Sequence, residues 1–151
     1  MRPMLSSSSY EVRFNTCFQD VIKGCRTVKR KGEPGTWLSD KMTSAYTDLY
    51  NHGYAISVET FKENKLVGGL YGVIIDKCFF GESMFSEIPN ASKLALIKLA
   101  EKLEQLNFEF IDCQIHNPHL EKMGAELIDR ENFLILLKKG INFDVNISEF
   151  K

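Results

Sequence analysis

Two carboxylates and one amide are the residues of this sequence whose types and spacing best suit chemistry. Asp112 and Gln114 are two positions apart in a β-rich run, so they should share one face of a strand while Ile111 and Cys113 take the other. Glu82 interrupts an aromatic run on an expected neighbouring strand, where a charge is unusual. Such a group could move a proton and stabilise a developing oxyanion, or its members could only satisfy one another in a polar seam.

The elements that must position these residues follow from the spacing of apolar side chains. Alternation predicts strands at 10–14, 54–61, 65–76, 78–86 and 109–115. Helical spacing predicts helices that begin after Thr16, Ser39 and Asn90, a short helix at 118–124 and a last one at 130–138. Residues 1–9 are expected to be a flexible lead and 10–151 a single domain. The order predicts an α/β (α+β) fold with a mixed, mainly antiparallel sheet flanked by helices.

Composition narrows the class of protein. The chain has 151 residues, of which 44% are hydrophobic and 26% charged, which is ordinary for one globular domain. No apolar run approaches the roughly 18 residues that a membrane span needs. The formal net charge of -1 means that any nucleic acid must be held by a local patch. Four scattered cysteines without a C-x-x-C pair, and no apolar signal core, predict a reducing, cytoplasmic location.

Three further patterns have both a functional and an ordinary interpretation. Cys113-x-x-His116-x-x-His119 has a metal-like spacing, but a fourth ligand is lacking nearby and we expect no metal. Trp37, the single tryptophan, follows a basic stretch and could stack on a nucleic-acid base, or could be a core residue beside a solvated loop. Asn90 to Lys93 opens a helix and could bind a phosphate, or could be simple helix punctuation.

A set of short motifs extends over about residues 9–137. In chain order they are Gly35-Thr36-Trp37, Ala45-Tyr46, Leu66 to Gly72, Phe80 to Ser86, Asn90 to Lys93, Ile111 to Gln114, Asn117, His119-Leu120 and Gly124-Ala125. In this order and spacing they resemble the leucyl/phenylalanyl-tRNA-protein transferases, and the order of elements is similar to the GNAT acyltransferase superfamily. The resemblance implies a GNAT-like fold and transfer of leucine or phenylalanine from charged tRNA to proteins that begin with arginine or lysine, in the N-degron route.

The resemblance also implies roles for individual residues. Asp112 and Gln114 would lie at the reacting centre, and Glu82 would support them and help to receive the basic N-terminus. Trp37 would stack on the terminal adenosine of the tRNA. The leucyl or phenylalanyl side chain would enter an apolar pocket, and the substrate-binding residues would be Leu70, Phe79, Leu96, Leu103, Ile111, Ser83 and Asn117. Neither a cofactor nor a metal is implied.

The sequence departs from the family in two regions. It starts just before the catalytic domain, without the family's usual N-terminal domain, and Gly140 to Ile147 replaces the expected aromatic, proline-rich stretch. A non-catalytic module that captures basic N-termini or tRNA ends therefore stays open. So does a GNAT-like acyltransferase with a different activated donor, although the glycine-rich turn that holds coenzyme A in such enzymes is missing.

Overall fold

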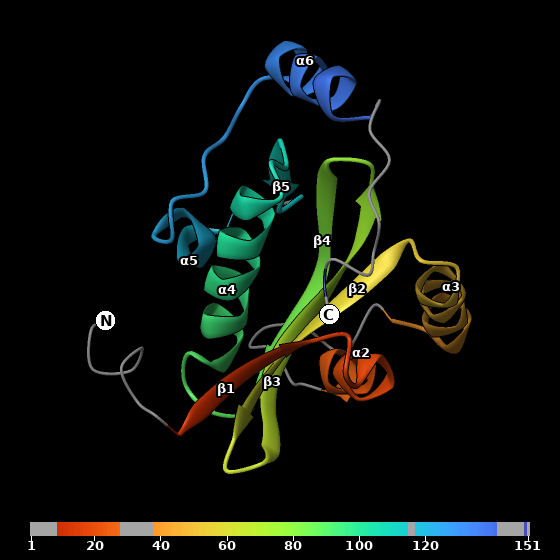
Figure 1. The fold of residues 1–151 in the computed structure, drawn as a ribbon, viewed down its shortest axis with the longest axis vertical. Helices are drawn as coiled ribbons and strands as arrows, with labels where there is room; N and C mark the ends of the chain where they lie inside the picture. Colours follow the sequence, from red (N-terminus) through yellow and green to blue (C-terminus); the bar gives the residue numbers. More distant parts are fainter. Residues whose placement is uncertain (1–8, 28–37, 115–116, 142–149, 151) are drawn as a thin grey trace.

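The computed structural model describes residues 9–27, 38–114, 117–141 and 150, and it is built around a five-stranded sheet. The strands lie in chain order, β1 (Tyr10–Phe14), β2 (Ala55–Lys62), β3 (Lys65–Ile75), β4 (Cys78–Ser86) and β5 (Phe110–Asp112) (Figure 1). The first four pair antiparallel, whereas β5 runs parallel to β4. This confirms the predicted mixed sheet. The predicted strand 109–115 was too long, because β5 ends at Asp112.

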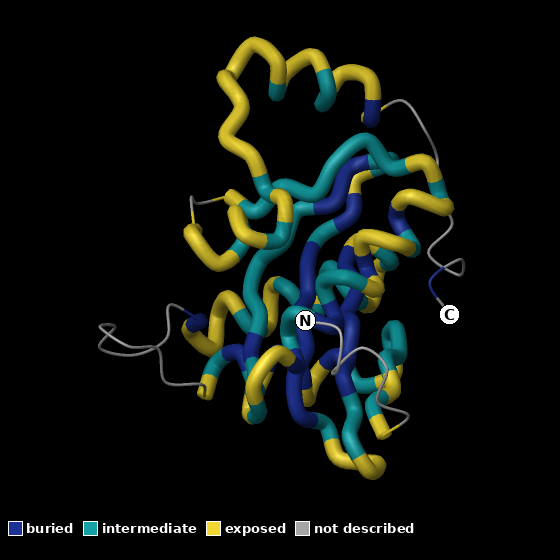
Figure 2. The backbone as a smooth tube through the Cα atoms, turned by 90° about the vertical axis from the view of Figure 1, so that its left-hand side faces the viewer, coloured by how far each residue is buried: buried dark blue, intermediate teal, exposed yellow. Residues whose placement is uncertain are grey.

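Helices cover both faces of this sheet, as Figure 1 shows. They are α2 (Phe18–Thr27), α3 (Asp40–Asn51), α4 (Ala91–Gln105), α5 (Pro118–Glu121) and α6 (Arg130–Gly140). Alternation along β2 sends Ile56 and Val58 to the α4 face and Ala55 to the face of α2 and α3. Two separate apolar clusters result, one on each face, and the central strands are the most buried part of the chain (Figure 2).

The helix beginnings differ in how their free N–H groups are satisfied. Ser39 caps α3 as predicted, since its Oγ accepts from the N–H of Met42 at 3.2 Å. At α4 Asn90 holds the N-cap position as predicted, but its side chain makes no cap hydrogen bond. There the hydroxyl of Ser86, at the end of β4, accepts from the N–H of Ser92 at 2.8 Å. The start of α4 is therefore tied to the sheet that it covers.

The start of α2 is anchored by a carboxylate that the sequence did not single out. Glu59 on β2 is fully buried and accepts from the N–H of Thr16 at 3.2 Å and from its hydroxyl at 2.8 Å. The hydroxyl of Ser57 makes a short third bond to the same carboxylate. Thr16 therefore donates to Glu59 rather than capping α2 with its own oxygen. A buried carboxylate is tolerated here because three donors replace its water.

Glycines in β3 allow close packing within the protein. A Cβ atom on Gly72 would lie 2.4 Å from Cζ of Phe79 and 2.5 Å from the carbonyl oxygen of Phe80. A Cβ atom on Gly68 would lie 2.5 Å from Cβ of Ala91. These glycines therefore bring β3, β4 and α4 together, which accounts for their presence in a strand.

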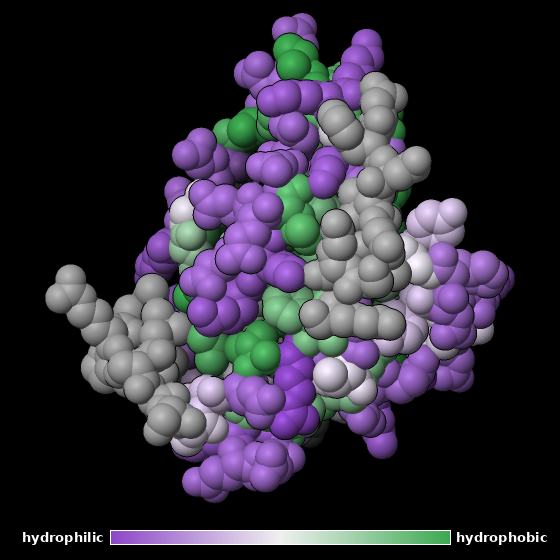
Figure 3. Space-filling view, viewed as in Figure 1, coloured by the Kyte–Doolittle hydropathy of each residue, from purple (hydrophilic) through white to green (hydrophobic). Residues whose placement is uncertain are grey.

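Apolar side chains that remain exposed gather near α6. Leu127, Ile128, Leu134 and Ile135 are all exposed, and Figure 3 shows green, apolar side chains among hydrophilic ones at this end of the molecule. Among the described residues, helices are all too short or too polar to cross a bilayer.

Candidate active site at the end of β5

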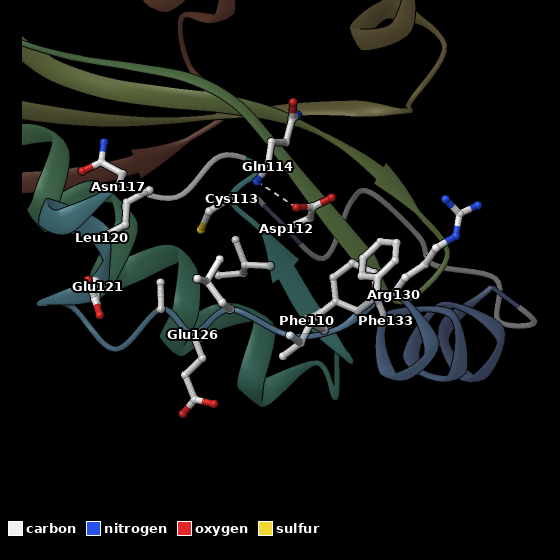
Figure 4. Close-up of a pocket in the computed structure, with 14 residues that line it drawn as sticks. Phe110, Asp112, Cys113, Gln114, Asn117, Leu120, Glu121, Glu126, Arg130 and Phe133 are labelled. Atoms are coloured by element: carbon white, nitrogen blue, oxygen red, sulfur yellow. Dashed lines mark hydrogen bonds between the residues drawn. The ribbon is translucent and has the colours of Figure 1, made fainter.

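Asp112 and Gln114 lie together, but not as alternating residues of one strand. β5 ends at Asp112, and Gln114 has a left-handed backbone with φ of 65°. This turn brings the N–H of Gln114 to 2.7 Å from Oδ1 of Asp112 (Figure 4). The two residues are therefore coupled through a backbone-to-carboxylate bond, and the predicted reason for their proximity was wrong.

The side chain of Gln114 reaches back to the neighbouring strand. Its Nε2 donates to the carbonyl oxygen of Gly81 on β4 at 2.7 Å. The parallel pairing of β4 with β5 has its last pair at Phe80 and Asp112, whereas β4 continues to Ser86. The Gln114 side chain thus joins the two strands beyond the end of their regular pairing. One N–H of its amide is used in this bond, and the amide has a second N–H to offer.

Glu82 occupies a β-bulge next to this bond. Tyr71 pairs with Ser83 and Gly72 pairs with Gly81, so Glu82 is the extra residue of β4. A bulge redirects its side chain and interrupts the ladder, which is a frequent arrangement beside functional sites. The Glu82 carboxylate accepts a bond of 2.7 Å from the hydroxyl of Tyr46 on α3. Glu82 is therefore adjacent to Gly81 in the chain, but its bond is to Tyr46 rather than to Asp112 or Gln114.

Tyr46 is a residue that the analysis of the sequence did not assign to the site. Its ring packs edge-on against Tyr71 with centroids 5.1 Å apart, which holds the hydroxyl in place. Burial, followed by the bond to Glu82, raises the pKa of Tyr46 well above its ordinary value. The hydroxyl consequently stays protonated and donates. The signal available in the sequence was its place in the Ala45-Tyr46 motif on the inward face of a helix.

The predicted apolar residues lie together on the α4 face of the sheet. Leu70, Phe79 and Leu103 are fully buried in one cluster, and Leu96 and Ile111 pack against it partly buried. Phe150 is buried in the same cluster.

The remaining predicted substrate-binding residues are placed differently. Ser83 is half-buried on β4, and Asn117 caps α5 by accepting from the N–H of His119 at 2.8 Å. Trp37 lies outside the described residues.

A cavity of about 750 Å³ lies between β5 and the segment 117–133. Phe110 and Phe133 give it an apolar lining at one end, Asn117 and Leu120 lie at the other, and Asp112 and Gln114 border it between them (Figure 4). Cys113 also lines it, and burial, then the Asp112 charge, raises the pKa of this thiol.

The described residues contain no group of three or more histidine, cysteine or acidic side chains that could hold a metal ion. His116, the middle residue of the metal-like spacing, lies outside the described residues.

Comparisons with known proteins identify what this arrangement is similar to. A family model described as leucyl/phenylalanyl-tRNA protein transferase matches residues 1–138. A leucyl/phenylalanyl-tRNA–protein transferase from Flavobacterium johnsoniae is 46% identical over 138 residues, covering 91% of this chain and 65% of that protein. The one from Thermodesulfovibrio yellowstonii is 50% identical over 137 residues, covering 91% and 56% respectively. The chain thus spans less than two thirds of the length of these relatives.

Solved structures support the fold alone. A ribosomal-protein-alanine N-acetyltransferase from Brucella melitensis matches with a TM-score of 0.57 at 11% identity, covering 80% of this chain and 92% of that one. A GNAT family acetyltransferase from Staphylococcus aureus matches with a TM-score of 0.53 at 16% identity, covering 80% and 93%. The predicted GNAT-like fold is therefore confirmed.

Proposed function

Because the chain belongs to the leucyl/phenylalanyl-tRNA protein transferase family, we propose that it transfers leucine or phenylalanine from charged tRNA to proteins that begin with arginine or lysine. The α-amine of such a protein is the acceptor, and the product enters the N-degron route of the cytoplasm. The observation that carries the proposal is the bonded set of Asp112, Gln114 and the Gly81 carbonyl, with Glu82 next in the chain.

The chemistry requires little beyond proton transfer and orientation. The amino acid is already activated as an ester of the tRNA ribose, so the acceptor ammonium has only to lose a proton before it attacks. Oδ1 of Asp112 accepts the Gln114 N–H. In this proposal the second oxygen of the carboxylate takes the proton of the acceptor. The neutral amine then forms a bond to the ester carbon, and the bond from that carbon to the ribose oxygen breaks. The nitrogen gives up a second proton as it becomes an amide, and the leaving ribose oxygen takes up that proton.

The amide and the second carboxylate have supporting roles in this proposal. Gln114 is fixed by the Gly81 carbonyl, so its other amide N–H can donate to the oxyanion that develops on the ester. Glu82, held by the Tyr46 hydroxyl, supplies negative charge for the basic N-terminus of the acceptor. A preorganised donor needs no rearrangement during the reaction, which is why it stabilises the transition state.

The donor is expected to contact the apolar cluster on the α4 face of the sheet and Trp37. Its side chain would be received by Leu70, Phe79, Leu96, Leu103 and Ile111, which share one cluster or its border. The terminal adenosine would stack on Trp37. Ser83 and Asn117 would contact the substrates as the family motifs imply.

A transfer assay tests the proposal. Labelled Leu-tRNA and Phe-tRNA are incubated with a peptide that begins with arginine, and the same peptide with an acetylated N-terminus is the acceptor control. Asp112→Asn should lower kcat by about 100-fold or more, as expected when a proton acceptor is lost. Asp48→Asn, at an exposed position of α3, is the matched control and should retain the rate. Absence of transfer by a folded wild-type protein in excess would refute the proposal.

Measurements of binding and of thermal stability separate the two other functions that the sequence left open. Peptide binding that survives Asp112→Asn, with no turnover by the wild type, would indicate a non-catalytic module. Thermal stabilisation by acetyl coenzyme A, but not by a puromycin-like adenosine mimic, would indicate a different acyl donor.

A further inference from the structure

We propose that the N-terminal segment of the acceptor protein binds as an added, antiparallel strand on the outer edge of β5. This inference rests on the proposed function, and it assigns the path of the acceptor chain. It follows from three features of the described residues: an edge strand, a cavity along that edge, and a reacting group at one end of it.

β5 is the last of the described strands in the sheet, and among the described residues no strand pairs with its second side. The carbonyl oxygen of Asp112 points toward β4, because it lies 3.4 Å from the place of a Cβ atom on Gly81. Backbone groups of successive residues in a strand point to opposite sides. The N–H and C=O of Ile111 therefore face away from β4. An edge of this kind is a template for an incoming extended chain.

The cavity beside β5 has room for such a chain. Its volume of about 750 Å³ lies within the range typical of ligand sites. Its lining includes the consecutive residues 110–114 of β5 and the turn after it, together with residues 125–128. Figure 4 shows the chain that leads from α5 to α6 passing beside β5. At about 3.3 Å per residue, three or four acceptor residues would match the length of β5.

The direction of the added strand is set by the position of Asp112. β5 runs from Phe110 to Asp112. An antiparallel chain would therefore begin beside Asp112 and continue toward Phe110. A parallel chain would place its α-amine at the wrong end of the strand.

The charge around the cavity suits a basic segment. Among the described residues that line it, Asp112, Glu121 and Glu126 are acidic and only Arg130 is basic. The α-ammonium and the basic first side chain of the acceptor would enter a region of negative potential, which favours encounter and orientation.

A backbone scan of the acceptor tests this proposal on the unmodified enzyme. Peptides of five residues that begin with arginine carry one N-methyl group, at position 2, 3 or 4 in turn. The acceptor residue opposite Ile111 loses a bond to β5 when methylated, and we expect KM to rise by about fivefold to tenfold. Methylation of its immediate neighbours, whose N–H groups point away, should change KM by less than about twofold. Equal sensitivity, or equal tolerance, at the three positions would overturn the proposal.

A second measurement separates strand pairing from the transfer reaction itself. Arginine amide is an acceptor too short to form a strand, so its KM should exceed that of the five-residue peptide by about tenfold or more. Ala125→Trp fills the cavity and should raise the KM of the peptide by more than that of arginine amide, and should leave the KM of Leu-tRNA unchanged. Ala100→Trp, exposed on α4, is the matched control. Transfer to both acceptors with equal KM would refute the strand alone, whereas transfer to neither would refute the proposed function.

Discussion

Removal of one hydroxyl group from α3, in the variant Tyr46→Phe, should slow the proposed transfer substantially. The Tyr46 hydroxyl donates to Oε2 of Glu82 at 2.7 Å, and bonds to charged groups contribute about 1.5–3 kcal/mol. If this free energy is fully expressed in the transition state, kcat/KM falls by about 10- to 150-fold. The ring remains and keeps its edge-on contact with Tyr71. Because the pKa of Tyr46 is raised, the hydroxyl stays protonated and the loss should be the same from about pH 6 to pH 9.

The control for this variant lies on the same helix. Tyr50 is also half-buried, but its hydroxyl donates to the backbone oxygen of Asn15 at 3.3 Å, away from Glu82. Tyr50→Phe should therefore keep kcat/KM within about twofold of the wild type. The measurement is the initial rate of transfer from Leu-tRNA to an Arg-initiated peptide, accompanied by urea unfolding of both variants.

A double-mutant cycle identifies the partner through which Tyr46 acts. In a Glu82→Gln background the acceptor of its bond has lost its charge, so Tyr46→Phe should cause a much smaller further loss. If Tyr46→Phe is as active as the wild type, or if it causes the same loss in both backgrounds, the positioning of Glu82 by Tyr46 is refuted.

Three other predictions concern the framework and the cavity. Glu59→Gln should lower the free energy of unfolding by about 2 kcal/mol, because the fully buried carboxylate accepts three hydrogen bonds. Glu11→Gln, which removes an exposed ion pair, is the control and should leave the urea midpoint of unfolding unchanged. Gly72→Ala should lower the free energy of unfolding by about 1–3 kcal/mol. The added carbon would lie 2.4 Å from the Phe79 ring and 2.5 Å from the carbonyl oxygen of Phe80. At Gly81, whose added carbon would meet its nearest atom at 3.4 Å, the same change should have a smaller effect on unfolding. Alkylation of Cys113 at pH 8, followed by mass spectrometry, should be slower than that of a free thiol because its pKa is raised, and an equal rate would contradict its burial.

The order of elements could be predicted because alternation and helical spacing are strong over most of the chain. β1 and β4 have the predicted bounds, and α4 begins after Asn90 as predicted. β3 ends one residue earlier than predicted, and β2 is shifted by one residue at both ends. The largest error was the strand at 109–115, where β5 stops at Asp112. The strand is followed by a left-handed backbone at Gln114. This conformation is expected mainly of glycine, asparagine and aspartate, so a glutamine did not predict it.

The sequence predicted which residues form the site better than it predicted the hydrogen bonds between them. Asp112 and Gln114 are joined, yet by a turn and not by alternation. The bond from Tyr46 to Glu82 depends on a bulge, and the register that produces a bulge is decided by the pairing of whole strands. Glu59 was missed for a related reason. A polar residue in an alternating strand usually faces solvent, and only the packing of α2 on β2 makes this one buried.

The β-bulge at Glu82 on β4 and the turn at Gln114 after β5 lie at the same level of the sheet. Their proximity accounts for the site. The parallel ladder has its last pair at Phe80 and Asp112, immediately before the bulge on β4 and the turn after β5. Had the ladder continued, the Gly81 carbonyl would be taken by a backbone donor and the Gln114 amide would have no strand to hold it. Because the ladder stops, side chains satisfy these groups, and they present the remaining amide and carboxylate atoms to a substrate. The regular part of the sheet thus fixes the positions of β4 and β5, and the interruption between them supplies the polar groups that aminoacyl transfer needs.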